Sequence, residues 1–528
     1  MKLTLDGITN TAEYTKAGIA LPQFDTAAMR RETAENPEWV HFGAGNIFRG
    51  FIGSIAQELL NKGLMKTGIT AVESFDFDII DKIYVPHDNL TLNVTTDKSG
   101  NLKKEVLAGI ADAVKGCECD RLFEIAKKPS LKMISFTITE KGYAVTGLDG
   151  ELIGIVKSDI ENGIDYPKHT MSIIAAMLYK RFKAINKGIA IVSMDNCSHN
   201  GEKLKNGVMT VAKAWAESGT VEKDFIDYLD NAVSFPWSMI DKITPRPDNS
   251  IKEELENLGV SDMAPVITDR NTYIAPFVNA ETPQYLVIED DFPAGRPPFE
   301  AAGVYMTTRE TVNKAETMKV TTCLNPLHTG LAVFGCLLGY NTIWEEMRDS
   351  ELIKLVHAIA DEGMRVVIHP EIINPIDFVN EVINERLPNP YIPDAPQRIA
   401  TDTSQKIPVR YGETIKSYIK SDTLDAASLD AIPLVIAGWL RYVMAVDDNG
   451  ADFTPSPDPM LEDIRQALST VKFGEPQTAD GVLDDILVNP ILFGTDLCAA
   501  GLSDKIEGFF KSMIRGKGAV RNTLKTNL

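Results

Sequence analysis

Residues 39–50, WVHFGAGNIFRG, decide the fold of the first half of the chain. The apolar run at 39–42 is typical of a buried strand, and glycines follow at positions 43 and 45. From position 47 apolar side chains recur at helical spacing until Gly63, which we expect to end the helix. Strand, glycine turn and helix open a dinucleotide-binding unit, because the bare backbone of Gly43 and Gly45 lets a pyrophosphate approach the helix amides.

The glycine pattern departs from the usual one, since its sixth position holds Phe48. The next predicted strand, 69–75, adds support because Glu73 lies near its end, where an acid would bind the ribose hydroxyls of NAD. Asp76 and Asp78 are close enough to take that role instead. A solvated carboxylate after a strand explains Glu73 equally well at this point.

Two further strands of the same sheet are predicted at 131–138 and 189–194. Polar segments follow them at 139–143 and 195–201, where an open α/β sheet binds its ligand. Ordinary polar loops explain these segments slightly better when they are taken alone. A last strand is predicted at 285–288.

After Arg309 helical periods dominate, which predicts a mainly α-helical second domain. We place the boundary near residue 295, in the proline- and glycine-rich run 293–298, giving domains 1–295 (with an N-terminal arm) and 296–528. The predicted helices of the second domain are 328–340, 350–367, 375–386, 428–446, 459–471 and 504–515.

The helical half contains a candidate catalytic stretch at 318–340, MKVTTCLNPLHTGLAVFGCLLGY. Asn325 and Pro326 are predicted as N-cap and first helical residue, which places His328 one turn in, at N3. Lys319 beside such a helix end could exchange a proton with an alcohol or carbonyl. Spacing alone favours the alternative of an ordinary helix start with a structural histidine.

A second cluster in this half contains Arg398, Lys406 and Arg410. Three cations in a short span of an acidic protein could clamp a carboxylate or a polyol. A solvated helix face explains them as well, and we favour it when the cluster is taken alone.

Composition limits the class of protein. The 528 residues are too many for one core, and a formal charge of −21 argues against nucleic acid and anionic membranes as partners. Six irregularly spaced cysteines indicate reduced thiols, and the N-terminus lacks the apolar run of a secretion signal. We therefore expect a soluble, cytoplasmic protein, either a monomer or a small homo-oligomer.

Seven separate stretches match one protein family in its own order along the chain. They are HFGAGNIFRG (41–50), TITEKGY (137–143), MDN with the following NG (194–201), FPWSMIDKITP (235–245), VIEDDFPAGRPPFEAAG (287–303), 319–328 and RIATDTSQKIP (398–408). Together they resemble the long-chain polyol (mannitol) dehydrogenase and reductase family, and the segment at 287–303 most resembles its fructuronate-reducing branch.

The resemblance implies a zinc-independent NAD(H) enzyme with a Rossmann-type N-terminal domain and a helical C-terminal domain. It would interconvert a ketouronate and an aldonate, and by motif position Lys319 would be the catalytic acid/base. Asn196 and Asn325 would flank the reacting oxygen. The implied substrate-holding and orienting residues are His328, Arg398, Lys406 and Asp241. The implied cofactor-binding residues are Gly43, Gly45, Asn46, Phe48, Glu73 and Glu140.

One departure concerns the catalytic motif. The family spacing is K-x4-N-x2-H, whereas five residues separate Lys319 from Asn325 here. Either the extra residue bulges out before the helix, or Lys319 is displaced.

Other functions remain open. Within the family they are reduction of tagaturonate and reduction of neutral fructose to mannitol. The stretch 41–53 also resembles mannitol-1-phosphate dehydrogenase. A non-catalytic NAD-binding protein is a further alternative. A metal-dependent hydrolase or epimerase ranks last, because the seven histidines show no paired-ligand spacing.

Overall fold

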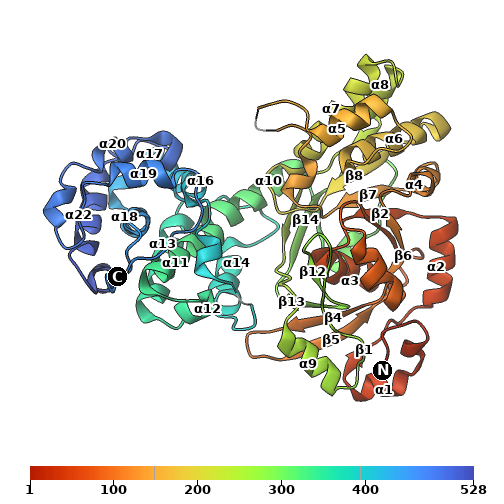
Figure 1. Cartoon of the computed structure of the whole chain (residues 1–528), viewed down its shortest axis with the longest axis horizontal. Coiled ribbons are helices and arrows are strands. Elements are labelled where there is room, and N and C mark those ends of the chain that lie inside the picture. Colours follow the sequence, from red (N-terminus) through yellow and green to blue (C-terminus); the bar gives the residue numbers. More distant parts are fainter. Residues whose placement is uncertain (148, 393) are drawn as a thin grey trace. The chain divides into compact units, whose positions relative to one another are not determined.

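The chain forms two compact units, Met1–Asn313 and Lys314–Leu528. The computed structural model describes residues 1–528 except 148 and 393 (Figure 1). The run 293–298, where the sequence places the boundary, lies inside the first unit. It does so because β15 (Tyr305–Thr307), which follows it, pairs in parallel with β14 (Tyr285–Glu289).

The first unit is built on a six-stranded sheet in the order β6-β3-β2-β7-β8-β9, with every neighbouring pair parallel. The predicted strands at 39–42, 69–75, 131–138 and 189–194 are confirmed as β2, β3, β7 and β8. The strand bounds are β2 Trp39–Phe42, β3 Ile69–Glu73, β6 Ile110–Lys115, β7 Met133–Phe136, β8 Ile189–Ser193 and β9 Val233–Ser234.

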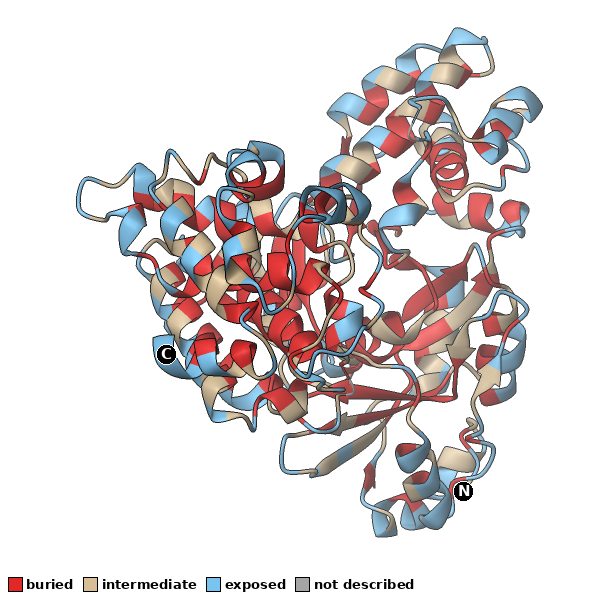
Figure 2. Cartoon of the chain, turned by 60° about the vertical axis from the view of Figure 1, so that its left-hand side comes forward, coloured by how far each residue is buried: buried red, intermediate tan, exposed pale blue. Residues whose placement is uncertain are grey.

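Both faces of this sheet are covered, which explains why its central strands β2, β3, β7 and β8 are largely apolar rather than alternating, whereas the edge strand β6 carries polar residues. On β2, Val40 and Phe42 belong to one apolar cluster and Trp39 to the other. Figure 2 shows buried residues along these strands and on the inner sides of the helices. The main helices of the unit are α2 Thr26–Glu35, α3 Gly53–Asn61, α4 Cys119–Ala126, α5 Gly154–Asn162, α6 Thr170–Ile185, α7 Asn200–Glu217 and α8 Asp224–Asn231.

Smaller sheets complete the first unit. The predicted strand at 285–288 is confirmed as β14, and it lies in a three-stranded sheet with β10 (Ser238–Asp241) and β15. A short hairpin joins β11 (Val266–Ile267) to β12 (Tyr273–Ile274). The remaining elements are α1 Thr11–Lys16, α9 Asn249–Asn257 and a four-stranded sheet of β1 Ile19–Ala20, β5 Leu102–Leu107, β4 Thr91–Thr96 and β13 Phe277–Glu281.

The described part of the second unit is helical, as predicted. Its centre is α18 (Ala431–Val443), which is buried along its whole length and packs against α11 (Asn325–Leu338). A Cβ at Gly438 would lie 2.7 Å from the ring of Phe334, so glycine permits this close packing. The other helices are α12 Ile343–Glu346, α13 Ser350–Met364, α14 Pro375–Glu381, α15 Pro396–Ile399, α16 Thr403–Ile407, α17 Glu413–Ile419, α19 Leu461–Ala467, α20 Asp484–Leu487, α21 Pro490–Phe493, α22 Ser503–Met513 and α23 Ala519–Asn527.

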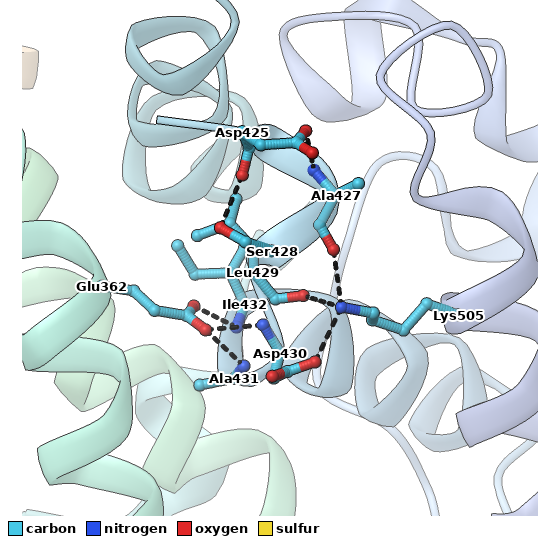
Figure 3. Close-up of polar contacts among 9 residues, drawn as sticks. All are labelled: Glu362, Asp425, Ala427, Ser428, Leu429, Asp430, Ala431, Ile432 and Lys505. Carbon is cyan, nitrogen blue, oxygen red and sulfur yellow. Dashed lines mark hydrogen bonds and ion pairs between the residues drawn. The ribbon is translucent and has the colours of Figure 1, made fainter. Parts of the chain in front are cut away.

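Two charged side chains fix the start of α18 (Figure 3). The carboxylate of Glu362 on α13 accepts hydrogen bonds from the first amides, those of Asp430, Ala431 and Ile432, at 2.6–2.9 Å. Lys505 on α22 donates to the carbonyl of Leu429 and also pairs with Asp430. The amides that a helix start leaves unpaired are thus satisfied by a side chain from another helix.

Five π-turns interrupt the described helices, and one of them lies in the candidate catalytic stretch. Residues Lys319–Cys323 form that turn between α10 (Arg309–Met318) and α11. The run 309–338 is long and apolar enough to cross a membrane, yet 72% of its most apolar window is buried in the fold, as in a core helix. The other π-turns are Phe48–Ile52, Ile80–Tyr84, Val382–Arg386 and Pro408–Gly412.

Candidate active site

The two glycines of the turn after β2 have different surroundings. Gly43 has a φ of +102°, and a Cβ there would lie 2.1 Å from the carbonyl oxygen of Thr137 on the neighbouring strand. At Gly45 a Cβ would meet no described atom within 4 Å. Gly43 is therefore required by the fold, whereas Gly45 leaves open space at the start of the helix. That space suits the close approach of a dinucleotide phosphate.

Glu73 connects the glycine turn to the segment after β3. One carboxylate oxygen accepts the amide of Ala44 at 3.0 Å, and the other accepts those of Phe75 at 2.8 Å and Asp76 at 3.1 Å. Burial raises the pKa of Glu73, and the three amides oppose that shift. A carboxylate has about four acceptor positions, so one remains for a ribose hydroxyl.

The other acids near β3 have protein partners. Asp76 is buried and accepts the hydroxyls of Thr268 and Thr272, both at 2.6 Å, while Asp78 pairs with Lys82 at 2.7 Å. Among the three acids, Glu73 alone accepts an amide of the glycine turn. It thus stays the predicted ribose acceptor.

The remaining predicted cofactor residues differ in exposure. Phe48 is fully buried and its ring stacks on His41 at 4.1 Å, so its side chain belongs to the core. Asn46 accepts a hydrogen bond from Arg49 at 2.8 Å. Glu140 is exposed and pairs with Lys203.

Asp195 brings together the two polar segments that follow β7 and β8. Its carboxylate accepts the amides of Ile138 at 2.8 Å and Thr139 at 2.9 Å, and the hydroxyl of Tyr143 at 2.5 Å. Sequence reasoning singled out Asn196 and missed Asp195, although both lie in the matching MDN triplet. Asn196 is exposed beside this junction. Asp241, the predicted orienting acid, is buried at the end of β10.

In the second unit the π-turn accommodates the extra residue of the lysine motif. The amide of Leu324 donates to the carbonyl of Lys319 at 3.2 Å, five residues back, where an α-helix would bond four back. A π-turn is a one-residue insertion into an α-helix, so the helix on each side keeps its direction. Lys319 opens this turn and is only 2% exposed.

The predicted helix start is wrong by one position. Leu324 precedes the helix and Asn325 is its first residue, so Asn325 is not the N-cap. His328 then lies at N4, and its amide donates to the carbonyl of Leu324 at 3.1 Å. The π-turn causes the shift, because it runs directly into α11 and leaves no extended residue for a side-chain cap.

His328, which is partly exposed, forms a pair with the buried Asp394 that the sequence did not indicate. Its Nε2 lies 3.0 Å from a carboxylate oxygen of Asp394. Burial is the main cause that lowers the pKa of His328, and Asp394 opposes that shift. In a neutral ring this bond places the proton on Nε2, which leaves Nδ1 as an acceptor for a substrate hydroxyl. No spacing pattern links position 394 to position 328, which explains the omission.

The predicted cations gather near this pair. The side chain of Arg398 is 71% exposed, and its Nε donates to Asp394 at 2.8 Å. Arg410 is held against the first turn of α11, where it donates to the hydroxyl of Thr329. The positive charges of Arg410 and Arg398 both lower the pKa of His328.

Lys406 has an evident structural role. Its ammonium donates to the carbonyl of Ile399 at 2.8 Å and to that of Thr401, at the end of α15. Burial, and then the charge of Arg410, lower the pKa of Lys406 to about 8. In the described residues no group of three or more histidine, cysteine or acidic side chains could hold a metal ion.

Comparison with known proteins identifies the family. Residues 37–301 match the model of the mannitol dehydrogenase Rossmann domain, and residues 311–486 match that of the mannitol dehydrogenase C-terminal domain. The chain is 52% identical to D-mannonate oxidoreductase of Thermotoga maritima, over 99% of this chain and 98% of the relative. It is 27% identical to mannitol 2-dehydrogenase of Pyricularia oryzae, over 94% and 93% of the two chains.

Solved structures agree on the fold. Substrate-free D-sorbitol dehydrogenase superposes with a TM-score of 0.81 at 25% identity, over 97% of this chain and 98% of that one. Mannitol 2-dehydrogenase of Pseudomonas fluorescens, solved with NAD and D-mannitol, gives a TM-score of 0.72 at 24% identity, over 100% and 99%. This chain belongs to the mannitol dehydrogenase family, whose members are NAD-dependent oxidoreductases that act on CH–OH groups.

Proposed function

We propose that the chain is an NAD(H)-dependent oxidoreductase that interconverts D-fructuronate and D-mannonate. The observation that carries the proposal is the 52% identity to a D-mannonate oxidoreductase, which extends over 99% of the chain. The cations near His328 support an anionic substrate, because arginine is suited to bind a carboxylate. Six free thiols support a reducing compartment, and we place the enzyme in the cytoplasm.

The cofactor is NAD(H), which supplies the hydride to the substrate carbonyl carbon in the reducing direction. We assign its phosphates to the open space at Gly45 and its ribose to the remaining acceptor position of Glu73. Both assignments rest on the surroundings of these residues in the first unit. Asn46, Phe48 and Glu140 remain predicted contacts.

Lys319 is the proposed acid/base. As negative charge develops on the carbonyl oxygen, its ammonium gives that oxygen a proton, and in the oxidising direction the neutral amine removes the alcohol proton. Its near-complete burial supports this role, because a proton held there is shielded from exchange with bulk water. Asn196 and Asn325 are the proposed amide donors to the same oxygen, each typically worth about 3 kcal/mol in the transition state.

His328 and Arg398 are the proposed substrate-holding residues. The Nδ1 of His328 would accept a substrate hydroxyl, while the exposed part of Arg398 would meet the carboxylate. The ammonium of Lys406 already binds two backbone carbonyls, so we expect Lys406 to attract the substrate carboxylate through its positive charge rather than by a direct hydrogen bond. Asp241 remains the proposed orienting acid.

A panel of ketouronates and ketoses with NADH tests the substrate, with loss of reduced-nicotinamide absorbance as the readout. We expect D-fructuronate to give the highest kcat/KM. Mannitol 2-dehydrogenases at 28% identity favour neutral fructose as the second candidate, and tagaturonate is the third. A higher kcat/KM for fructose than for any ketouronate would contradict the proposal.

Two substitutions test the roles. Lys319→Ala should abolish turnover while NADH still binds, and normal turnover would exclude the acid/base role. Arg398→Ala should raise KM for fructuronate by roughly fivefold, the effect of a largely exposed ion pair worth about 1 kcal/mol. It should leave KM for fructose nearly unchanged. Arg465→Ala on α19, which removes an exposed arginine paired with Glu462, is the control.

A further inference from the structure

An exposed aromatic ring lies just beyond the carboxyl end of β3. Phe75 is 68% exposed, two residues after Glu73. The guanidinium carbon of Arg270 lies 5.1 Å from the centre of its ring. Arg270 itself is exposed in the turn between β11 and β12. Among the residues that the structure describes, no carboxylate or hydrogen-bond acceptor pairs with its guanidinium.

This pair is held firmly relative to the glycine turn. Glu73 accepts the amides of both Phe75 and Ala44, so one carboxylate fixes the backbone of Phe75 and the glycine turn together. Asp76 accepts the hydroxyls of Thr268 and Thr272, at the two ends of the turn that carries Arg270.

A third hydrogen bond fixes the same turn. The amide of Asp269 donates to the carboxylate of Asp78 at 3.0 Å. Three hydrogen bonds thus tie the turn between β11 and β12 to the segment after β3. An exposed ring and an unpaired guanidinium on anchored backbone form a preorganised platform, and preorganisation reduces the entropy that a ligand loses on binding.

The fold indicates which ligand fits this platform. In a dinucleotide-binding sheet the acid at the end of the second strand binds the adenosine ribose, and the adenine follows directly. Phe75 occupies that position, and both an aromatic ring and a guanidinium stack on a purine face. Figure 1 shows β12 in the same unit as α3, the helix that follows the glycine turn.

We propose that Phe75 and Arg270 form the adenine subsite for NAD(H). The adenine stacks on the exposed ring of Phe75, and the guanidinium of Arg270 swings outward and covers the other face of the base. The inference rests on the proposed placement of the cofactor at Gly45 and Glu73. It adds two contacts that the glycine motif does not indicate.

Truncated cofactors test this inference, because each carries one half of NADH. ADP-ribose contains the adenosine half without nicotinamide, and its Kd is measured by calorimetry. Reduced nicotinamide mononucleotide lacks adenosine, so kcat/KM measured with it reports how the enzyme uses the nicotinamide half alone. This ratio can be measured even when the enzyme is not saturated with the mononucleotide. The variants are Phe75→Ala and Arg270→Ala. Tyr166→Ala, which removes an aromatic residue that is 69% exposed, is the matched control.

We expect each variant to raise Kd for NADH and for ADP-ribose by roughly five- to fifty-fold, the usual effect of removing a stacking partner of a base. The kcat/KM with the mononucleotide should stay within about twofold of the wild-type value, and Tyr166→Ala should change neither. Unchanged binding of ADP-ribose overturns the inference. An equal loss with the mononucleotide also overturns it, since it would show a general disturbance.

Gly45→Ala separates this inference from the placement of the cofactor. If Gly45→Ala weakens NADH binding while the two platform variants do not, the adenine subsite alone is wrong. If none of the three variants weakens NADH binding, the cofactor placement is wrong as well.

Discussion

The contrast between Gly43 and Gly45 gives the sharpest prediction, because one methyl group at each position has opposite consequences. Gly43→Ala places a Cβ 2.1 Å from the carbonyl oxygen of Thr137, about 0.9 Å inside the 3.0 Å limit of real contacts. That oxygen cannot retreat freely, because the amide of Thr137 bonds the carbonyl of Phe42 at 2.9 Å.

The expected cost has two parts. A left-handed backbone costs an alanine about 1–2 kcal/mol, and the overpacked contact costs a further 1–3 kcal/mol or so. The free energy of unfolding of Gly43→Ala should therefore fall by roughly 2–5 kcal/mol. At about 2–4 °C per kcal/mol for a large domain, Tm should drop by roughly 4–20 °C.

Gly45→Ala should behave differently. The φ of Gly45 lies outside the left-handed region, and a Cβ there would meet no described atom within 4 Å. The free energy of unfolding of the unliganded protein should therefore stay the same or rise by up to about 1 kcal/mol. The methyl group fills the space assigned to the cofactor phosphates, so Kd for NADH should rise at least tenfold, about 1.4 kcal/mol.

Calorimetric unfolding and nicotinamide fluorescence titration measure the two effects on the same samples. Wild-type NADH affinity in a folded Gly45→Ala protein would refute the reasoning. So would a Gly43→Ala protein with an unchanged Tm.

Three other predictions concern the second unit. Deletion of Thr321 should convert the π-turn into an α-helical turn and leave kcat/KM within about tenfold of the wild-type value, because the directions of the flanking helices are kept. Deletion of Val333 inside α11 is the control, and circular dichroism should show that it abolishes folding. Asp394→Asn should lower kcat/KM by roughly 10- to 100-fold through a lost charged hydrogen bond, and should shift the titration of His328 in the pH profile to lower pH, because Asp394 raises the pKa of His328. Glu346→Gln should unfold at a higher temperature than the wild type at pH 8, and at the same temperature at pH 4. The reason is that burial raises the pKa of Glu346 well above its ordinary value in the folded protein. As pH rises, the unfolded wild type therefore loses this proton before the folded one does, and that difference favours unfolding.

Apolar patterning was sufficient to predict four strands of the main sheet, β14 and most long helices of the second unit. Those four main-sheet strands are nearly continuous apolar runs, and the helices repeat apolar residues every three or four positions. The edge strands β6 and β9 and the four-stranded sheet were not predicted, because their strands are short or carry polar residues. The π-turn at Lys319 could not be predicted this way, because one extra residue in a helix hardly changes such a period. The predicted N-cap at Asn325 failed for the same reason.

The candidate site was predictable where a motif fixes local geometry. Gly43 and Glu73 belong to one strand-turn-helix-strand unit, and their contacts follow from it. Asp394 and Asp195 act through contacts between distant segments, which no local spacing reveals. Arg398 and Lys406 were found by charge, but their protein partners emerged only in three dimensions.

The fixing of the start of α18 from two sides has a consequence for synthesis on the ribosome. Glu362 precedes α18 in the chain, whereas Lys505 and the rest of α22, which packs along α18, are made after it. Until α22 leaves the exit tunnel, α18 lacks the part of its cover that α22 provides. The second unit therefore completes its folding only after α22 has been made, and nascent chains released before α22 should depend on chaperones.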